Sequence, residues 1–92
     1  MDPVFEVGDL VKPTADYKKE RKHTSSQCKL GVVIGFKETG SEQLYKVYWW
    51  PHGAYFFFPP QYLVLISRAA IDIDNCSLND LAAELQDKAD NI

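Results

Sequence analysis

The side chains that could perform acid–base, nucleophilic or metal chemistry are few in this sequence and lie far apart. The chain contains two histidines, His23 and His52, and two cysteines, Cys28 and Cys76. A catalytic nucleophile needs a base within hydrogen-bond reach, and a zinc site needs closely spaced Cys and His ligands. Because the sequence holds no CxxC pair and no Cys/His cluster, we predict no catalytic site, no metal site and no cofactor.

Two further points complete this chemical inventory. Asp72 and Asp74 alternate with isoleucines, and we interpret them as solvated acids at an edge of the domain. The two cysteines admit either one disulfide or two free thiols, and the lack of any disulfide framework favours thiols in a reducing compartment. The chain is therefore predicted to act by contact, not as an enzyme.

Basic residues gather in a segment that has almost no large apolar side chain, residues 14–29. From Tyr17 to Lys29, five basic side chains stand against the single acid Glu20: Lys18, Lys19, Arg21, Lys22 and Lys29. We expect a long loop here, which is either simply solvated or contacts phosphates while Tyr17 or His23 stacks on bases. The net charge of −3 argues against a general binder of polyanions. Nucleic-acid binding by residues 17–29 is thus the alternative function.

The C-terminal part has the opposite charge. From residue 67 onward, six acidic residues stand against two basic ones, Arg68 and Lys88. A basic loop on one copy can meet an acidic helix on the next, so the arrangement also suits head-to-tail protein contacts.

The most informative stretch is LYKVYWWPHGAYFFFPPQYLVLI, residues 44–66, which contains both Trp residues and most of the other aromatic ones. A small domain cannot easily bury all of them, and exposed aromatic side chains are enriched at protein interfaces. The core is expected to take some of Val47, Trp49, Phe56 and Phe58. The predicted protein interface consists of Tyr48, Trp50, Tyr55, Phe57 and Tyr62. The open alternative is that the C-terminal helix covers these aromatics with Leu78, Leu81, Leu85 and Ile92.

The elements that must position these residues are five strands and one helix. The patterns predict strands over 4–12, 30–36, 44–50, 54–58 and 63–66, with a 3₁₀ turn after Pro59-Pro60. Closing the sheet into a barrel would remove its exposed edge strands. The five predicted strands therefore indicate a small all-β barrel over residues 1–67. Residues 68–76 are expected to form a connector able to add an edge strand. Residues 77–92 are predicted to form an amphipathic α-helix capped by Ser77, docked on its own barrel or on a neighbour.

The stretches VGDLV (7–11), LGVVI (30–34) and FPPQYL (58–63) resemble those of Src-homology-three-like small barrels. The first two are similar to the opening of KOW-type and chromo-like barrels, and the third to the segment that closes true Src-homology-three domains. The Trp pair lies at the end of its strand, so a groove for proline-rich peptides is not implied. The overall pattern also resembles small uncharacterised proteins of tailed phages, especially cyanophages, which implies a virion or assembly role.

Together these observations predict a non-catalytic protein–protein interaction module, a minor structural or connector component of a phage virion. Its expected partners are other virion proteins or a second copy of itself, with no membrane involved. We expect a soluble protein made in the cytoplasm, since no signal peptide and no apolar run of membrane-spanning length is found.

Overall fold

The computed structural model describes residues 5–20 and 28–90, except for the side chains of Lys18, Glu20 and Leu78. Five strands, β1 (Leu10–Pro13), β2 (Cys28–Thr39), β3 (Glu42–Pro51), β4 (Ala54–Phe58) and β5 (Leu63–Ser67), form one antiparallel sheet. The helices are α1 (Ala15–Glu20) and α3 (Leu78–Asp90), with 3₁₀ turns η1 (Pro60–Tyr62) and η2 (Ile73–Asn75). The chain is thus mostly β with a C-terminal helix, as predicted.

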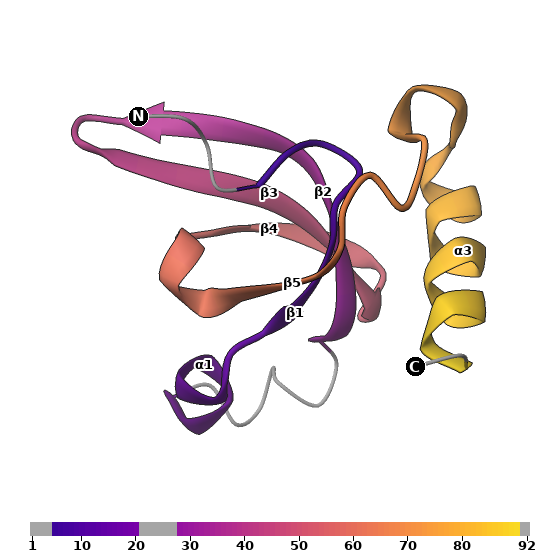
Figure 1. Cartoon of the computed structure of the whole chain (residues 1–92), viewed down its shortest axis with the longest axis horizontal. Coiled ribbons are helices and arrows are strands. Elements are labelled where there is room, and N and C mark those ends of the chain that lie inside the picture. The colour runs from indigo at the N-terminus through magenta and orange to yellow at the C-terminus, as the bar shows by residue number, and fades with distance from the viewer. Residues whose placement is uncertain (1–4, 21–27, 91–92) are drawn as a thin grey trace.

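The strand order is β4-β3-β2-β1-β5, so β4 and β5 are the two edges and the sheet does not close on itself. The predicted closure is therefore absent from the strand pairing. Pro59 and Pro60 lack the N–H groups that a ladder needs, and η1 turns the chain from β4 into β5, as the sequence predicts. Figure 1 shows the resulting curled sheet, in which the long β2–β3 hairpin reaches away from α3.

Several predicted boundaries differ from the observed ones. The first strand, expected over 4–12, begins only at Leu10, because the described residues 5–9 form a turn closed by the Asp9 N–H and the Glu6 carbonyl. The strand expected over 30–36 is longer and spans Cys28–Thr39. Residues 15–20 of the expected loop form the short helix α1, because Tyr17 is buried and anchors it to the sheet. The expected edge strand in residues 68–76 is not formed, and the turn η2 lies there instead. Residues 21–27 of the expected loop lie outside the described part of the chain.

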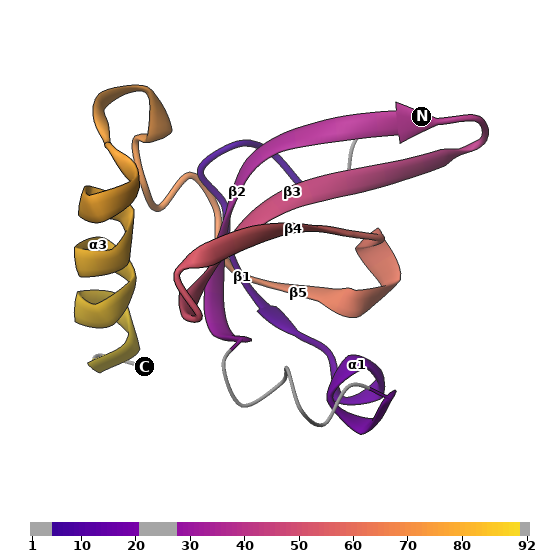
Figure 2. The ribbon, with the colours of Figure 1, turned by 180° about the vertical axis from the view of Figure 1, so that it is seen from behind.

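The two faces of the sheet bury separate apolar clusters. The inner cluster includes Phe5, Val11, Val47, Trp49 and Phe58, which the curl of the sheet encloses. The outer cluster joins the opposite face to α3 and is formed by Leu10, Leu30, Val32, Tyr48, Ile71, Leu81 and Leu85. Figure 2, from behind, again shows α3 packed along one side of the sheet. The C-terminal helix therefore docks on its own domain.

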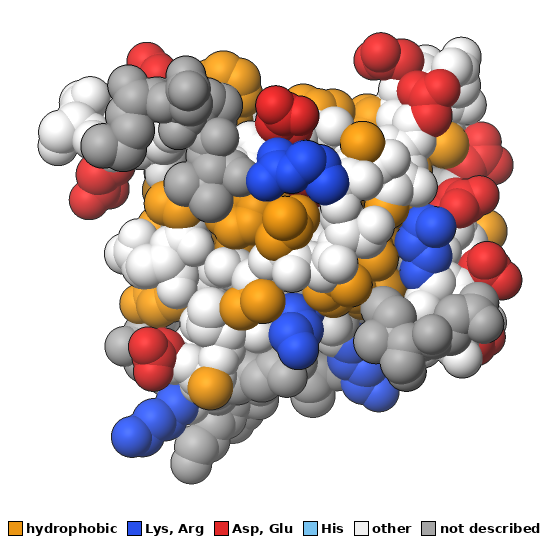
Figure 3. Space-filling model, in the orientation of Figure 1, with side chains coloured by type: hydrophobic (Ala, Val, Ile, Leu, Met, Phe, Trp, Pro, Cys, Tyr) orange, Lys and Arg blue, Asp and Glu red, His pale blue; other side chains and the backbone are white. Residues whose placement is uncertain are grey.

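The helix α3 is amphipathic, as its sequence predicts. Ser77 and Asp80 form a reciprocal capping box, in which each side chain accepts the main-chain N–H of the other at 3.3 Å. Leu81 and Leu85 are buried, whereas the acidic residues Asp80, Glu84, Asp87 and Asp90 are exposed. Figure 3 shows acidic side chains gathered over α3. No helix in the described ranges is both long and apolar enough to cross a membrane.

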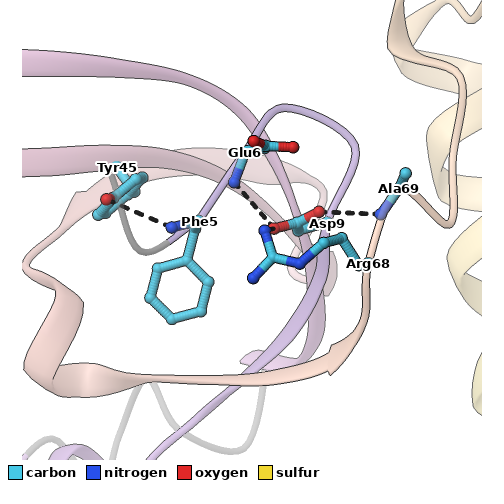
Figure 4. A network of polar contacts seen from close by, with 6 residues as sticks. All are labelled: Phe5, Glu6, Asp9, Tyr45, Arg68 and Ala69. Carbon is cyan, nitrogen blue, oxygen red and sulfur yellow. Dashed lines mark hydrogen bonds and ion pairs between the residues drawn. The ribbon is translucent and has the colours of Figure 1, made fainter. Parts of the chain in front are cut away.

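The turn before β1 fixes where the connector runs. The buried Asp9 carboxylate accepts N–H groups of Glu6 at 2.8 Å and Ala69 at 2.9 Å, and it pairs with Arg68 at 3.3 Å (Figure 4). Beside it, Gly8 has a φ of +97°, and a Cβ there would lie 2.5 Å from the carbonyl oxygen of Ile71. The Gly-Asp pair thus joins residues 68–71 to β1 and sets the position from which α3 begins.

Candidate interaction surface

The structure separates the five predicted interface residues into three groups by their exposure. Tyr55 and Phe57 lie on β4 with 47% and 43% of their surface exposed. Tyr48 is buried beneath α3, so its predicted exposure is wrong. Trp50 is half-buried against the same outer cluster, and Tyr62 is half-buried against the inner one. The helix therefore covers part of the aromatic set and leaves β4 open.

Strand register explains this division. Tyr55 is paired with Tyr48 and Phe57 with Lys46, so these side chains share the outer face with α3. The helix packs mainly on β2 and β3. The helix covers Tyr48 on β3, but it does not extend over Tyr55, the cross-strand partner of Tyr48 on β4.

Two lysines complete the exposed part of this face. The Lys46 ammonium lies 4.1 Å from the ring centroid of Tyr55, and the Lys37 ammonium lies 5.5 Å from that of Phe57. Cation–π contacts at exposed sites are worth about 0.5–1 kcal/mol each. Neither lysine forms an ion pair with an acidic residue of the described ranges. We call Lys37, Lys46, Tyr55 and Phe57 the aromatic–lysine surface.

The other face of β4 also carries an exposed aromatic side chain. Phe56, one of the four core candidates, is 41% exposed and makes an edge contact with His52, while Val47, Trp49 and Phe58 are buried. The strand thus has three consecutive exposed aromatic residues next to a free main-chain edge. Natural proteins usually shield such edges, since they are ready to pair with another chain.

The predicted nucleic-acid contacts are only partly described. Lys19 on α1 and Lys29 on β2 are exposed, whereas Arg21, Lys22, His23 and the side chain of Lys18 lie outside the described part. Tyr17 is buried with its ring 4.7 Å from Phe58, so the expectation that it stacks on bases is wrong. Lys29 lines a hollow of about 210 Å³ together with Lys12, Leu30, Trp50, Ile66 and Ala89.

The chemically reactive side chains stay apart in space. Cys28 lies in the inner cluster and Cys76 beside the outer one, and both are free thiols. Burial raises the pKa of Cys28, and a hydrogen bond with Tyr17 partly opposes this rise. Desolvation raises the pKa of Cys76, as do the nearby carboxylates of Asp80, Glu84 and Asp72. Both shifts disfavour the reactive thiolate.

The acidic pair of the connector is exposed to solvent. Asp72 accepts a hydrogen bond from the Asn75 amide at 2.6 Å, and Asp74 lies in η2. Within residues 5–20 and 28–90, no three Asp, Glu, His or Cys side chains are grouped so that they could hold a metal ion. The aromatic–lysine surface is therefore the feature on which a functional proposal is best built.

Comparisons of the chain with protein-family models, with curated proteins and with solved structures gave no match.

Proposed function

We propose that the protein is a non-catalytic interaction module that binds another protein through the aromatic–lysine surface. The observation that carries this proposal is the exposure of Tyr55 and Phe57 on β4. The docked helix beside them buries Tyr48, the cross-strand partner of Tyr55, but leaves these two rings uncovered. Aromatic side chains supply large contact areas at little cost in side-chain entropy. Lysines beside the rings favour a partner with acidic groups.

The fold proposal is a Src-homology-three-like barrel that is open between β4 and β5. It is supported by the last strand pairing with the first and by the 3₁₀ turn within FPPQYL. Phe58 of β4 and Leu63 of β5 also belong to one enclosed cluster. The proposal that the protein is a virion component, a minor structural or connector protein of a phage, rests on the sequence resemblance.

The test compares two phenylalanines that are both exposed but lie on opposite faces. Phe57 belongs to the surface, whereas Phe36 on β2, 57% exposed, is paired with Tyr45 and faces the other way. Affinity capture with wild-type, Phe57→Ala and Phe36→Ala baits should retain the same identified protein on wild type and Phe36→Ala only. Binding should then be reproduced with the purified partner. If Phe57→Ala retains every partner that wild type retains, this surface is not the interface.

A second candidate function, binding of single-stranded nucleic acid, is favoured by the hollow at Trp50. Lys12 and Lys29 lie there beside an aromatic ring, and neither forms an ion pair within the described ranges. Aromatic stacking combined with phosphate contacts is the usual mode of binding single strands. Affinity for an oligonucleotide should then fall with salt at a log–log slope of about −0.7 for each phosphate contacted. A slope near zero removes this candidate.

A further inference from the structure

We propose that the partner of the aromatic–lysine surface is a second copy of this chain, which presents the acidic side of α3. The inference rests on the proposed function and names its partner. It is carried by the charge complementarity of two exposed features of one molecule, and by the match between their spacings.

The acidic side of α3 is a regular stripe. Asp80, Glu84 and Asp87 follow one another at intervals of four and three residues, which places them on one side of a helix. All three are exposed, and Leu81 and Leu85 hold the opposite side against the sheet. The stripe therefore points away from the domain that carries it.

The basic groups of the surface have a matching separation. Lys37 is paired with Leu44, and Lys46 is paired with Gly35, so the two lysines are diagonal neighbours on one face. Diagonal neighbours on adjacent strands lie roughly 7–8 Å apart. Residues four apart on a helix are separated by about 6 Å along its axis. Two lysines can therefore meet consecutive carboxylates of the stripe, with the rings of Tyr55 and Phe57 packed against the helix between them.

This contact cannot form within one molecule. The surface and α3 lie side by side on the outer face of the same sheet, and the stripe faces solvent. When the aromatic–lysine surface of one copy binds the stripe of a second copy, the first copy still presents its stripe and the second copy still presents its surface. Such head-to-tail contacts produce a closed ring or an open filament.

Charge reversal offers a direct test because the two halves of the contact lie on different copies. Lys46→Glu places like charges against the stripe, and Glu84→Lys places like charges against the surface. For each variant alone, the Kd of self-association measured by sedimentation velocity at low salt should rise by roughly tenfold or more. An equimolar mixture of the two should associate again, because every contact in an alternating assembly then joins opposite charges.

Matched controls are available on exposed sites elsewhere. Lys19→Glu and Asp16→Lys, both at exposed positions of α1, make the same charge changes away from both features, and they should associate like wild type. Restored association in the mixture also shows that both variants are folded. The inference is overturned if wild type is monomeric at all concentrations, or if the mixture behaves like each variant alone. A third outcome separates this inference from the proposed function. If wild type is monomeric but captures a different protein that Phe57→Ala does not capture, then the partner is not a second copy, and the proposed function stands.

Discussion

Asp9 is a carboxylate with no exposed surface, and it binds segments that are about sixty residues apart in the chain. The sequence marks this position only as part of a Gly-Asp turn. The hydrogen bonds to the N–H groups of Glu6 and Ala69 make it the point where the connector joins the sheet. Its ion pair with Arg68 adds little, since that side chain is 50% exposed.

Replacement of Asp9 by alanine should therefore destabilise the protein. Two main-chain donors would lose their acceptor, and each such loss costs about 1–3 kcal/mol, so we expect a loss of about 2–6 kcal/mol. Urea unfolding followed by circular dichroism measures this. Asp74→Ala, at an exposed carboxylate, is the control and should change the free energy of unfolding by no more than about 0.5 kcal/mol. Equal effects of the two changes would refute the role given to Asp9.

The aromatic residues show what can and cannot be predicted at this scale. The two-residue period of a strand places Tyr48 and Trp50 on one face, and the hairpin adds Tyr55 and Phe57 to it. Which of the four are exposed depends on where α3 docks. That position is set by long-range contacts of Gly8 and Asp9 with residues 68–71, which no local pattern reveals.

At the scale of elements, local signals predict the helix and the hairpins well. The spacing of Leu81 and Leu85, the capping box at Ser77 and the break at Pro59-Pro60 all have the predicted effect. Strand closure is a different matter, because pairing of β4 with β5 depends on the global curl of the sheet. The preference for closed edges is general, yet this sheet leaves both β4 and β5 open.

Docking of α3 on its own sheet predicts that its buried leucines stabilise the whole domain. Leu85 has no exposed surface and packs in the outer cluster. Leu85→Ala should reduce the free energy of unfolding by about 2–5 kcal/mol, because it removes buried methyl groups and leaves a cavity. Thermal and urea unfolding measure the loss.

The control is Leu65→Ala on the edge strand β5, where 38% of the side chain is exposed. It should cost clearly less than Leu85→Ala, since less apolar surface is removed from the interior. A helix that docked only on a neighbouring molecule would instead make the cost of Leu85→Ala depend on protein concentration. That result would contradict the docking of α3 within one domain.

At the scale of the whole molecule, the exposed features form a dipolar arrangement. An acidic stripe lies on α3, and beside it the exposed rings of Tyr55 and Phe57 on β4 contact Lys37 of β2 and Lys46 of β3. The opposite charges of the two ends of the chain are visible in the sequence. The pairing of Lys37 and Lys46 with rings of β4 is not, because it requires the register of three strands.

The central claim is that the outer face of β4 is a protein interface between copies of the chain. Sedimentation velocity of wild type, Phe57→Ala and Phe36→Ala over a range of concentrations tests it most directly. The account predicts association of wild type and Phe36→Ala, and monomers for Phe57→Ala, since only Phe57 belongs to the aromatic–lysine surface. Association of Phe57→Ala at the wild-type level, or monomers for all three proteins, would contradict it.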